Sequence, residues 1–182
     1  MKRKPDEDEL LLLDPNVPVV ALDFETANSN RDSACALALI RVEGRRVVDQ
    51  QRWLIRPTTS RFSNTQIHKI TWDDVRNEGS FRTVWCKARK MLDGAGVLVA
   101  HSAPFDRSVL RACCEMSRLR MPKQPFGCTV RLSRLLWHLD NHRLPTVAKH
   151  LGLRLKHHNP LSDALVCARI VIAARREAAA FR

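Results

Sequence analysis

An apolar run that ends in two carboxylates constrains this chain more than any other feature. Residues 17–22 have the composition of a buried β-strand, and Asp23 and Glu25 follow directly, with Phe24 between them. Because alternate side chains of a strand share one face, Asp23 and Glu25 should point together into the space beyond the strand. Two like charges held this close resist joint ionisation unless a cation lies between them. The plainer alternative is a solvated strand end that leads into a turn.

The order of the remaining elements predicts an α/β fold. Segments 34–42 and 46–55 are rich in β-forming residues and flank Gly44, a pattern typical of a hairpin, so three antiparallel strands follow one another. Residues 97–100 and 127–130 are expected to be short buried strands. Helices are expected to begin near residues 71, 81, 104, 131, 144 and 160. We therefore predict a mixed sheet, with three antiparallel strands followed by parallel ones, flanked by helices.

The length of 182 residues predicts one domain with a single core. We expect residues 1–16 to be a flexible tail and residues 17–182 to form the domain. No apolar run approaches the roughly 18 residues that a membrane helix needs, and the basic residues 2–4 are followed by acidic ones, not by the apolar core of a signal peptide. The six cysteines lack zinc-site spacing and indicate reduced thiols in a cytoplasmic protein.

The charge balance points to a polyanionic partner. The chain has 31 Lys and Arg residues against 19 Asp and Glu residues, a net charge of +12. An excess of this size is expected of a protein that follows a phosphate backbone. A generic basic surface or an anionic membrane would give the same sum. Charge therefore favours nucleic acid without establishing it.

Two further acidic residues occupy positions where apolar segments end. Asp106 lies just after the strand 97–100, in the first turn of the next helix, and Asp163 lies in the first turn of the last helix. Together with Asp23 and Glu25 they would bring four carboxylates from three segments to one edge of the sheet. Carboxylate oxygens suit Mg²⁺ or Mn²⁺, and four such groups suggest two ions.

A histidine precedes the last of these acids. His158 lies five residues before Asp163, which would place its imidazole beside the carboxylates, where it could accept a proton from an attacking water. The alternative is an ordinary solvated histidine in a basic loop, which is what we expect of the neighbouring His157.

At three places the chain resembles the DEDDh exonucleases, a family that includes the proofreading epsilon subunit of bacterial DNA polymerase III, RNase T and oligoribonuclease. Residues 23–26 look like the first motif of that family, and residues 101–106 resemble the second. Residues 158–164 are similar to the third, in which a histidine lies five residues before an aspartate. The motifs occur in the family's order and span most of the chain.

This resemblance implies a ribonuclease H-like fold and hydrolysis of nucleic acid from the 3′ end to nucleoside 5′-monophosphates. It implies that two Mg²⁺ or Mn²⁺ ions are held by Asp23, Glu25, Asp106 and Asp163. The general base would be His158.

The resemblance also implies contacts with the terminal nucleotide. Thr26 and Phe105 match residues that meet this nucleotide in the family, and His68 matches the histidine of an Ile-His-Gly-Ile motif. For Phe105, a place in the core is an equally good interpretation. Three positions depart from the family pattern: Lys69 and Ala27 replace common glycines, and Ser102 replaces a common asparagine.

The substrate stays open at this stage. Single-stranded 3′ ends are expected, with DNA favoured and RNA as the alternative, because the contact that senses a 2′-hydroxyl is not readable. A binding module without catalysis is the rival from another class, but all five expected acidic and histidine residues are present. The first motif and its surroundings look more like a stand-alone bacterial branch than the replicative subunit. No long tail follows the last helix, so a stable polymerase-subunit role is possible but not favoured.

Overall fold

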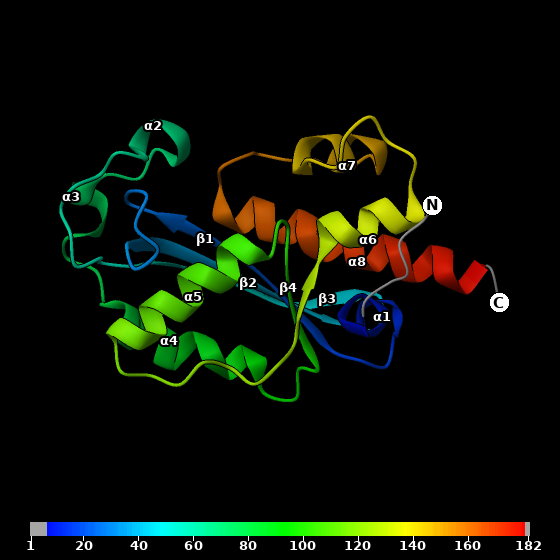
Figure 1. Cartoon of the computed structure of the whole chain (residues 1–182), viewed down its shortest axis with the longest axis horizontal. Helices are drawn as coiled ribbons and strands as arrows, with labels where there is room; N and C mark the ends of the chain where they lie inside the picture. Colours follow the sequence, from blue (N-terminus) through cyan, green and yellow to red (C-terminus); the bar gives the residue numbers. More distant parts are fainter. Residues whose placement is uncertain (1–6, 181–182) are drawn as a thin grey trace.

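The computed structural model describes residues 7–180, which build a five-stranded mixed sheet between two layers of helices (Figure 1). The strand order is β3-β2-β1-β4-β5. The central strand β1 (Val19–Thr26) runs antiparallel to β2 (Ala34–Glu43) and parallel to β4 (Val97–Ala100). The outer strands are β3 (Arg46–Leu54) and β5 (Phe126–Cys128). The predicted α/β fold with three antiparallel strands and then parallel ones is confirmed.

Burial explains why β1 takes the centre. Residues 19–22 are all fully buried, without the polar alternation of a strand that faces water on one side, because helices cover both faces of the sheet. In the outer strand β3, residues 46–50 alternate between exposed and half-buried positions, and no residue of the strand is fully buried. In the β1–β2 register, Asp23 lies opposite Ala38 and Glu25 opposite Ala36. These small neighbours leave the space beside the two carboxylates open.

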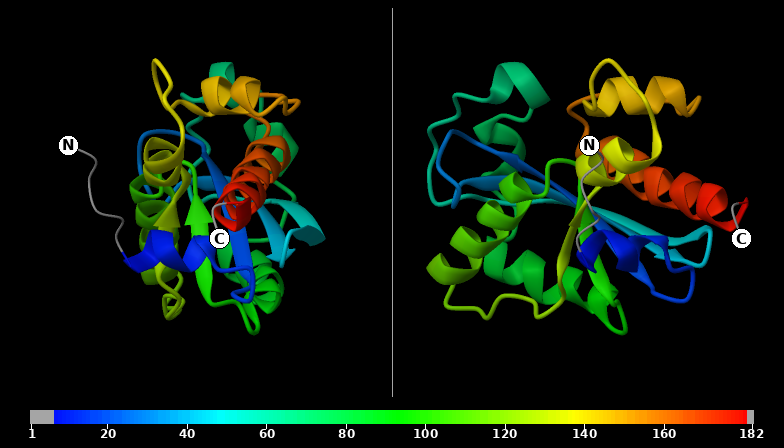
Figure 2. Two further views of the ribbon diagram at one scale, coloured as in Figure 1. Left: turned by 90° about the vertical axis from the view of Figure 1, so that its right-hand side faces the viewer. Right: turned by 45° about the vertical axis from the view of Figure 1, so that its right-hand side comes forward.

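One helical layer is formed by α4 (Phe81–Ala88), the 3₁₀ helix η1 (Arg89–Leu92) and α5 (Pro104–Met116). The other is formed by α6 (Thr129–Leu136), α7 (Leu144–His150) and the long α8 (Pro160–Ala180), which lies across β1 and β2. Figures 1 and 2 show the two layers on opposite faces of the sheet. As a result, the N-terminal ends of α5 and α8 approach the end of β1 from opposite sides.

Two short helices, α2 (Thr65–His68) and α3 (Trp72–Val75), follow the third strand. The expected capping box starts α3: Asp74 N–H donates to Thr71 Oγ1, and Thr71 N–H donates to Asp74 Oδ2 at 2.8 Å. Ile70 and Val75 pack with Cys35 in a small separate cluster. This cluster holds α2 and α3 against the outer end of β1 and β2.

The structure corrects the expectation of a flexible tail for residues 7–16. Helix α1 (Glu7–Leu13) packs on β5 and α8, with Leu12 fully buried against Gly127. Glu9 is 1% exposed, and its Oε1 accepts hydrogen bonds from Cys128 N–H and the Arg131 side chain. The short spacing of apolar residues in 10–13 gave no hint of these partners. The first six residues lie outside the described part of the chain.

The end of the last strand also lies earlier than expected. We predicted a strand over 127–130 and a helix over 131–138, whereas β5 ends at Cys128 and α6 spans Thr129–Leu136. The apolar character of Val130 comes from packing on the core rather than from a strand. Among residues 7–180, no helix combines the length and apolar character needed to cross a membrane.

Candidate active site

The paired carboxylates of β1 lie where the strand leaves the sheet. The ladder with β2 is irregular between Glu25 and Thr26, so the strand bends directly after the second carboxylate. Asp23 and Glu25 are half-buried and line one cavity of about 960 Å³. The shared face that the sequence predicted for them is therefore found.

Asp106 lies beneath this pair. It is 2% exposed, in the first turn of α5, and its Oδ1 accepts a hydrogen bond of 3.0 Å from Phe24 N–H. The donor belongs to the residue between Asp23 and Glu25. This bond joins the second motif directly to the first.

Asp163 enters from the opposite helical layer, in the first turn of α8. Its Oδ2 accepts a hydrogen bond from His158 N–H at 3.0 Å and lies 3.1 Å from His157 Nδ1. Its Oδ1 is buried and has no hydrogen-bond partner within residues 7–180. An oxygen in this state costs free energy unless a cation or a ligand group meets it.

Burial and mutual charge repulsion shift the pKa values of the four carboxylates. Burial, together with the charges of Asp106, Glu25 and Asp163, raises the pKa of Asp23 well above its usual value. Burial and the charges of Asp163 and Asp106 raise the pKa of Glu25 to about 8. Burial also raises the pKa values of Asp106 and Asp163, against the hydrogen bonds that each accepts. Four acids that interact in this way belong to one site.

This donor set fits hard divalent cations. It consists of carboxylate oxygens, which are the ligands that Mg²⁺ and Mn²⁺ prefer. The unpartnered Asp163 Oδ1 and the mutual repulsion of the acids are both relieved by positive charge placed between them. The residues that would hold the ions are those predicted from the sequence: Asp23, Glu25, Asp106 and Asp163.

Two histidines stand at the rim of the site. His157 and His158 are exposed, and their rings are stacked with centroids 3.9 Å apart. His158 has a φ of +62°, an uncommon backbone conformation that costs energy outside glycine. One ligand atom from each histidine and one from Asp163 lie within 4.8 Å of one another. His157, expected to be only solvated, therefore contacts the site directly.

Thr26 and His68, two of the predicted nucleotide contacts, are buried and bonded to each other. His68 is 7% exposed, and its Nδ1 accepts a hydrogen bond from Ile70 N–H, so Nε2 carries the proton and donates to the Thr26 carbonyl at 3.1 Å. Asn64 Nδ2 donates to the carbonyl and hydroxyl oxygens of Thr26. Both ring nitrogens of His68 thus bond backbone groups, and this residue holds the Thr26 carbonyl in place. Both residues are buried, and neither is among the residues that line the cavity.

Phe105 lines the cavity and also packs against the core, so both interpretations of this residue hold in part. The guanidinium carbon of Arg31 lies 4.4 Å from the centre of its ring, a cation–π contact. Burial raises the pKa of Asp106, and the Arg31 charge offsets a small part of that rise. The sequence gave Arg31 no role, because the contact joins a loop to a helix more than 70 residues away.

His101 lines the cavity and bonds two other segments of its wall. Its Nε2 lies 3.0 Å from the His142 carbonyl and so must donate, which leaves Nδ1 to accept from the Thr129 hydroxyl at 2.8 Å. Burial lowers the pKa of His101 to about 4, which keeps this neutral form at working pH. The sequence placed His101 in the second motif without a role, and only its position directly after a buried strand signalled one.

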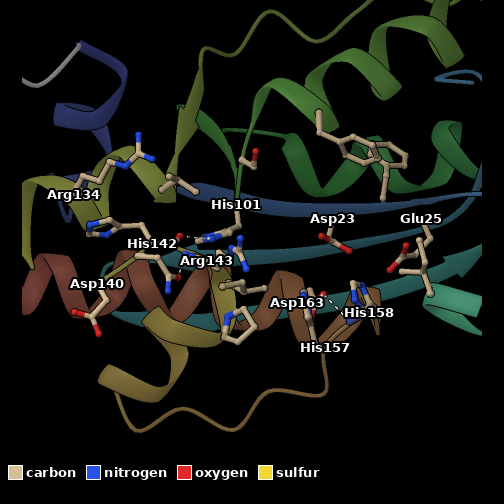
Figure 3. Close-up of a pocket in the computed structure, with 18 residues that line it drawn as sticks. Asp23, Glu25, His101, Arg134, Asp140, His142, Arg143, His157, His158 and Asp163 are labelled. Atoms are coloured by element: carbon tan, nitrogen blue, oxygen red, sulfur yellow. Dashed lines mark hydrogen bonds and ion pairs between the residues drawn. The ribbon is translucent and has the colours of Figure 1, made fainter. Parts of the chain in front are cut away.

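The cavity has two chemically different ends. Figure 3 shows Asp23, Glu25 and Asp163 gathered with His157 and His158 at one end, and Arg134, Asp140 and His142 at the other. In this view Arg143, at the start of α7, lies between the two groups, beside His101. A ligand that extends along the cavity from the acids would meet Arg143 and then Arg134.

Comparison with known proteins identifies the family of this chain. A family profile described as an exonuclease, RNase T, matches residues 20–171. The chain belongs to this exonuclease family. It is a 3′-to-5′ exonuclease domain of the DEDDh type, and exonucleases of this type depend on divalent metal.

The curated relatives of this exonuclease domain are much longer proteins. A PolC-type DNA polymerase III from Oceanobacillus iheyensis is 31% identical over 150 residues, which are 80% of this chain and 10% of the relative. The corresponding protein of Clostridium perfringens is 30% identical over 157 residues, 84% of the chain and 11% of the relative. The chain thus spans about a tenth of the length of these relatives.

Solved structures of exonucleases share the fold. Exonuclease X in complex with 5′ overhanging duplex DNA has a TM-score of 0.73 at 23% identity, covering 88% of this chain and 93% of that one. The nuclease domain of 3′hExo, a DEDDh family member bound to rAMP, has a TM-score of 0.73 at 17% identity, covering 88% and 92%. At these identities the likeness concerns the fold.

Proposed function

We propose that this exonuclease domain removes nucleotides one at a time from the 3′ end of single-stranded nucleic acid, with DNA favoured, and releases nucleoside 5′-monophosphates. The observation that carries the proposal is a cavity lined by three carboxylates, with Asp106 buried beneath them and His158 at its rim. One of the three, Asp163, has a buried oxygen without a partner among residues 7–180. The proposed catalytic residues are Asp23, Glu25, Asp106, Asp163 and His158.

The carboxylates act by binding two divalent ions, Mg²⁺ or Mn²⁺. When bound, the ions supply a water of lowered pKa and stabilise the negative charge that builds on the scissile phosphate. Asp106 has little freedom to move, because Phe24 N–H fixes its Oδ1. Asp163 keeps Oδ1 available for an ion, while Oδ2 faces the histidine loop.

His158 serves as the general base. Burial and the neighbouring His157 lower the pKa of its imidazole, so it is neutral at pH 7 and able to accept a proton from the attacking water. The hydrogen bond from His158 N–H to Asp163 holds the loop that carries it. Within residues 7–180 no side-chain hydrogen bond occupies the His158 ring, which leaves its nitrogens free for this role.

Thr26 and Phe105 bind the terminal nucleotide. The Phe105 ring forms part of the cavity wall, where a base or sugar can pack on it. Thr26 is held by Asn64 and His68, so its position beside Glu25 is set before the substrate arrives. Because the acids lie in a partly buried cavity, a paired 3′ end must fray before it reaches them.

The direct test uses an oligodeoxynucleotide labelled at its 5′ end and incubated with Mg²⁺ or Mn²⁺. A ladder that shortens one nucleotide at a time, with nucleoside 5′-monophosphates as products, is expected. Asp163→Asn should lower the rate at least about 100-fold. The matched control is Glu115→Gln, which removes an exposed charge on α5. Internal cuts, or faster digestion of blunt duplex than of single strands, would overturn the proposal.

RNA is the second candidate substrate. Structures with the same fold include a 3′-exonuclease described in recognition of a histone mRNA stem-loop, with a TM-score of 0.75. The curated relatives, in contrast, are DNA polymerases. Matched DNA and RNA oligomers in the assay above decide between the two: a higher kcat/KM for RNA would reverse our preference for DNA.

A further inference from the structure

Two arginines line the cavity away from Glu25. Arg134, in α6, and Arg143, at the start of α7, share this cavity with Asp23, Glu25 and Asp163, and Figure 3 shows Arg143 nearer to the acids than Arg134. Both arginines are exposed, and within residues 7–180 neither guanidinium takes part in a hydrogen bond or an ion pair, with Asp140 or with any other residue. This part of the cavity therefore presents positive charge to whatever fills it.

The loop that carries Arg143 is anchored, so this charge has a defined place. The His142 carbonyl accepts from His101, and His142 Nδ1 donates to Ser133 Oγ at 2.9 Å, since the Ser133 hydroxyl itself donates to Val130. Asn141 Oδ1 accepts from Arg143 N–H. Arg134 lies close enough to His142 to lower its pKa. The loop is thereby tied to α6 and to His101, which directly follows β4.

We infer that Arg134 and Arg143 form a subsite for the backbone phosphates of the nucleotides upstream of the scissile bond. The inference rests on the proposed function, because it takes the terminal nucleotide to lie at the end of the cavity where Asp23, Glu25 and Asp163 gather. The rest of the strand then leaves through the other end of the cavity. A guanidinium group matches the geometry of a phosphate, which it can bind with two parallel hydrogen bonds.

The size of the cavity agrees with this path. Its volume of about 960 Å³ lies near the top of the roughly 300–1,000 Å³ that pockets for single small ligands span. A terminal nucleotide alone would leave the arginine end unfilled. The subsite would therefore make affinity depend on strand length, with a gain when the second and third phosphates become available.

Equilibrium binding tests the subsite without turnover. The probes are 5′-fluorescein oligothymidylates of two to ten nucleotides, measured by anisotropy in Ca²⁺ at 50–300 mM salt. For the ten-nucleotide probe, Arg134→Ala/Arg143→Ala should raise Kd about tenfold, as two exposed charge contacts would. It should also reduce the slope of log K against log salt by about 1.4, because each phosphate contact on a single strand contributes about 0.7.

The matched control is Arg169→Ala/Arg176→Ala, which removes the same charge from exposed positions of α8. It should change Kd less than about twofold and leave the salt slope as in the wild type. Circular dichroism checks that both variants are folded. If the two double variants show the same Kd and slope, or if the loss is as large for the dinucleotide as for the ten-nucleotide probe, the inference is overturned.

Failure of the proposed function would show elsewhere. The release of mononucleotides by the wild-type enzyme in Mg²⁺ tests that function, whereas binding in Ca²⁺ tests the subsite. In turnover, the Arg134→Ala/Arg143→Ala variant should raise KM more than it lowers kcat, because the lost contacts are to upstream phosphates and not to the reacting one. A fall in kcat alone would contradict a role in binding.

Discussion

The backbone N–H of Phe24 donates a hydrogen bond of 3.0 Å to Oδ1 of Asp106. The two residues are 82 positions apart in the sequence, and the donor lies between the two acids of β1. This bond fixes the third carboxylate beneath the first two, whatever the state of the site. The repulsion among the acids is therefore built into the fold, and folding must overcome it.

A first prediction follows for Asp23→Asn. The substitution removes a buried charge that repels three others, so the metal-free protein should become more stable while activity falls at least about 100-fold. A rise in Tm of more than about 2 °C at pH 8 is expected, the size of shift that 1 kcal/mol produces in a domain of this length. Scanning calorimetry in EDTA measures it. Glu115→Gln, an exposed acid on α5, should leave Tm unchanged.

A second prediction concerns pH. The pKa of Glu25 is about 8 in the folded state against an ordinary value of 4.5, so the folded state binds more protons than the unfolded state between these values. The free energy of unfolding of the metal-free protein should thus fall as pH rises from 6.5 to 8. His101, with a pKa of about 4, acts in the opposite direction only below about pH 6.5.

Divalent metal should remove this loss. Ions that bind only the folded state raise its stability, and they bind better as the acids lose their protons. Urea unfolding at pH 6.5 and 8, in EDTA and in saturating Mg²⁺ or Mn²⁺, measures the change. Stability that rises with pH between these values in EDTA would mean that the acids do not repel one another in the folded protein.

Much of the fold and of this site could be predicted from the sequence, because both depend on local signals. The end of an apolar run predicts the positions of Asp23 and Glu25. A proline in the first turn predicts the start of each helix that carries Asp106 or Asp163. Strand pairing followed from the hairpin at Gly44, whose φ is +59°. In each case the information lies within about ten residues of the feature.

What escaped prediction depends on contacts between distant segments. The contact of Arg31 with Phe105, and the bond from His101 to the His142 carbonyl, join residues that no periodicity connects. The same is true of α1, whose buried Glu9 finds partners more than 100 positions away. The loop conformation, with a φ of +62° at His158, also decides that the ring of His157 contacts Asp163. These contacts depend on how distant segments pack in the folded chain, and the local sequence does not specify them.

A third prediction separates these two histidines. If His158 is the general base, His158→Ala should lower kcat about 10²–10⁴-fold. His157 contacts Asp163 Oδ2 and should act by positioning it, so His157→Ala should lower kcat less and raise the Mg²⁺ concentration needed for half-maximal rate. Single-turnover rates across a Mg²⁺ titration measure both effects. The opposite ranking of the two variants would exchange the roles.

A fourth prediction tests the role of His68. Its two ring nitrogens bond backbone groups of Thr26 and Ile70, so His68→Ala leaves the Ile70 N–H without a side-chain partner and the Thr26 carbonyl with only its bond from Asn64. We expect a loss of about 1–3 kcal/mol in the free energy of unfolding. The exposed His138→Ala is the control. Normal stability combined with a raised KM would instead indicate that His68 contacts the nucleotide directly.

A fifth prediction concerns Lys69, which stands where the family pattern often has glycine. Its φ is +65°, a conformation that strains residues with a Cβ and that glycine adopts freely. Lys69→Gly should therefore increase the free energy of unfolding by up to about 1 kcal/mol, although the bond from Lys69 Nζ to the Gln66 carbonyl is lost. Because the residue follows His68, activity should not fall if α2 keeps its place.

The reverse change at Gly152 calibrates this effect. Gly152 has a φ of +64°, and a Cβ added there would meet nothing within 4 Å, so the cost of Gly152→Ala comes from the backbone alone. It should lower the free energy of unfolding by about 1 kcal/mol. Urea unfolding of both variants gives the comparison. If Lys69→Gly destabilises the protein while Gly152→Ala behaves as expected, the lysine side chain contributes more than its strained backbone costs.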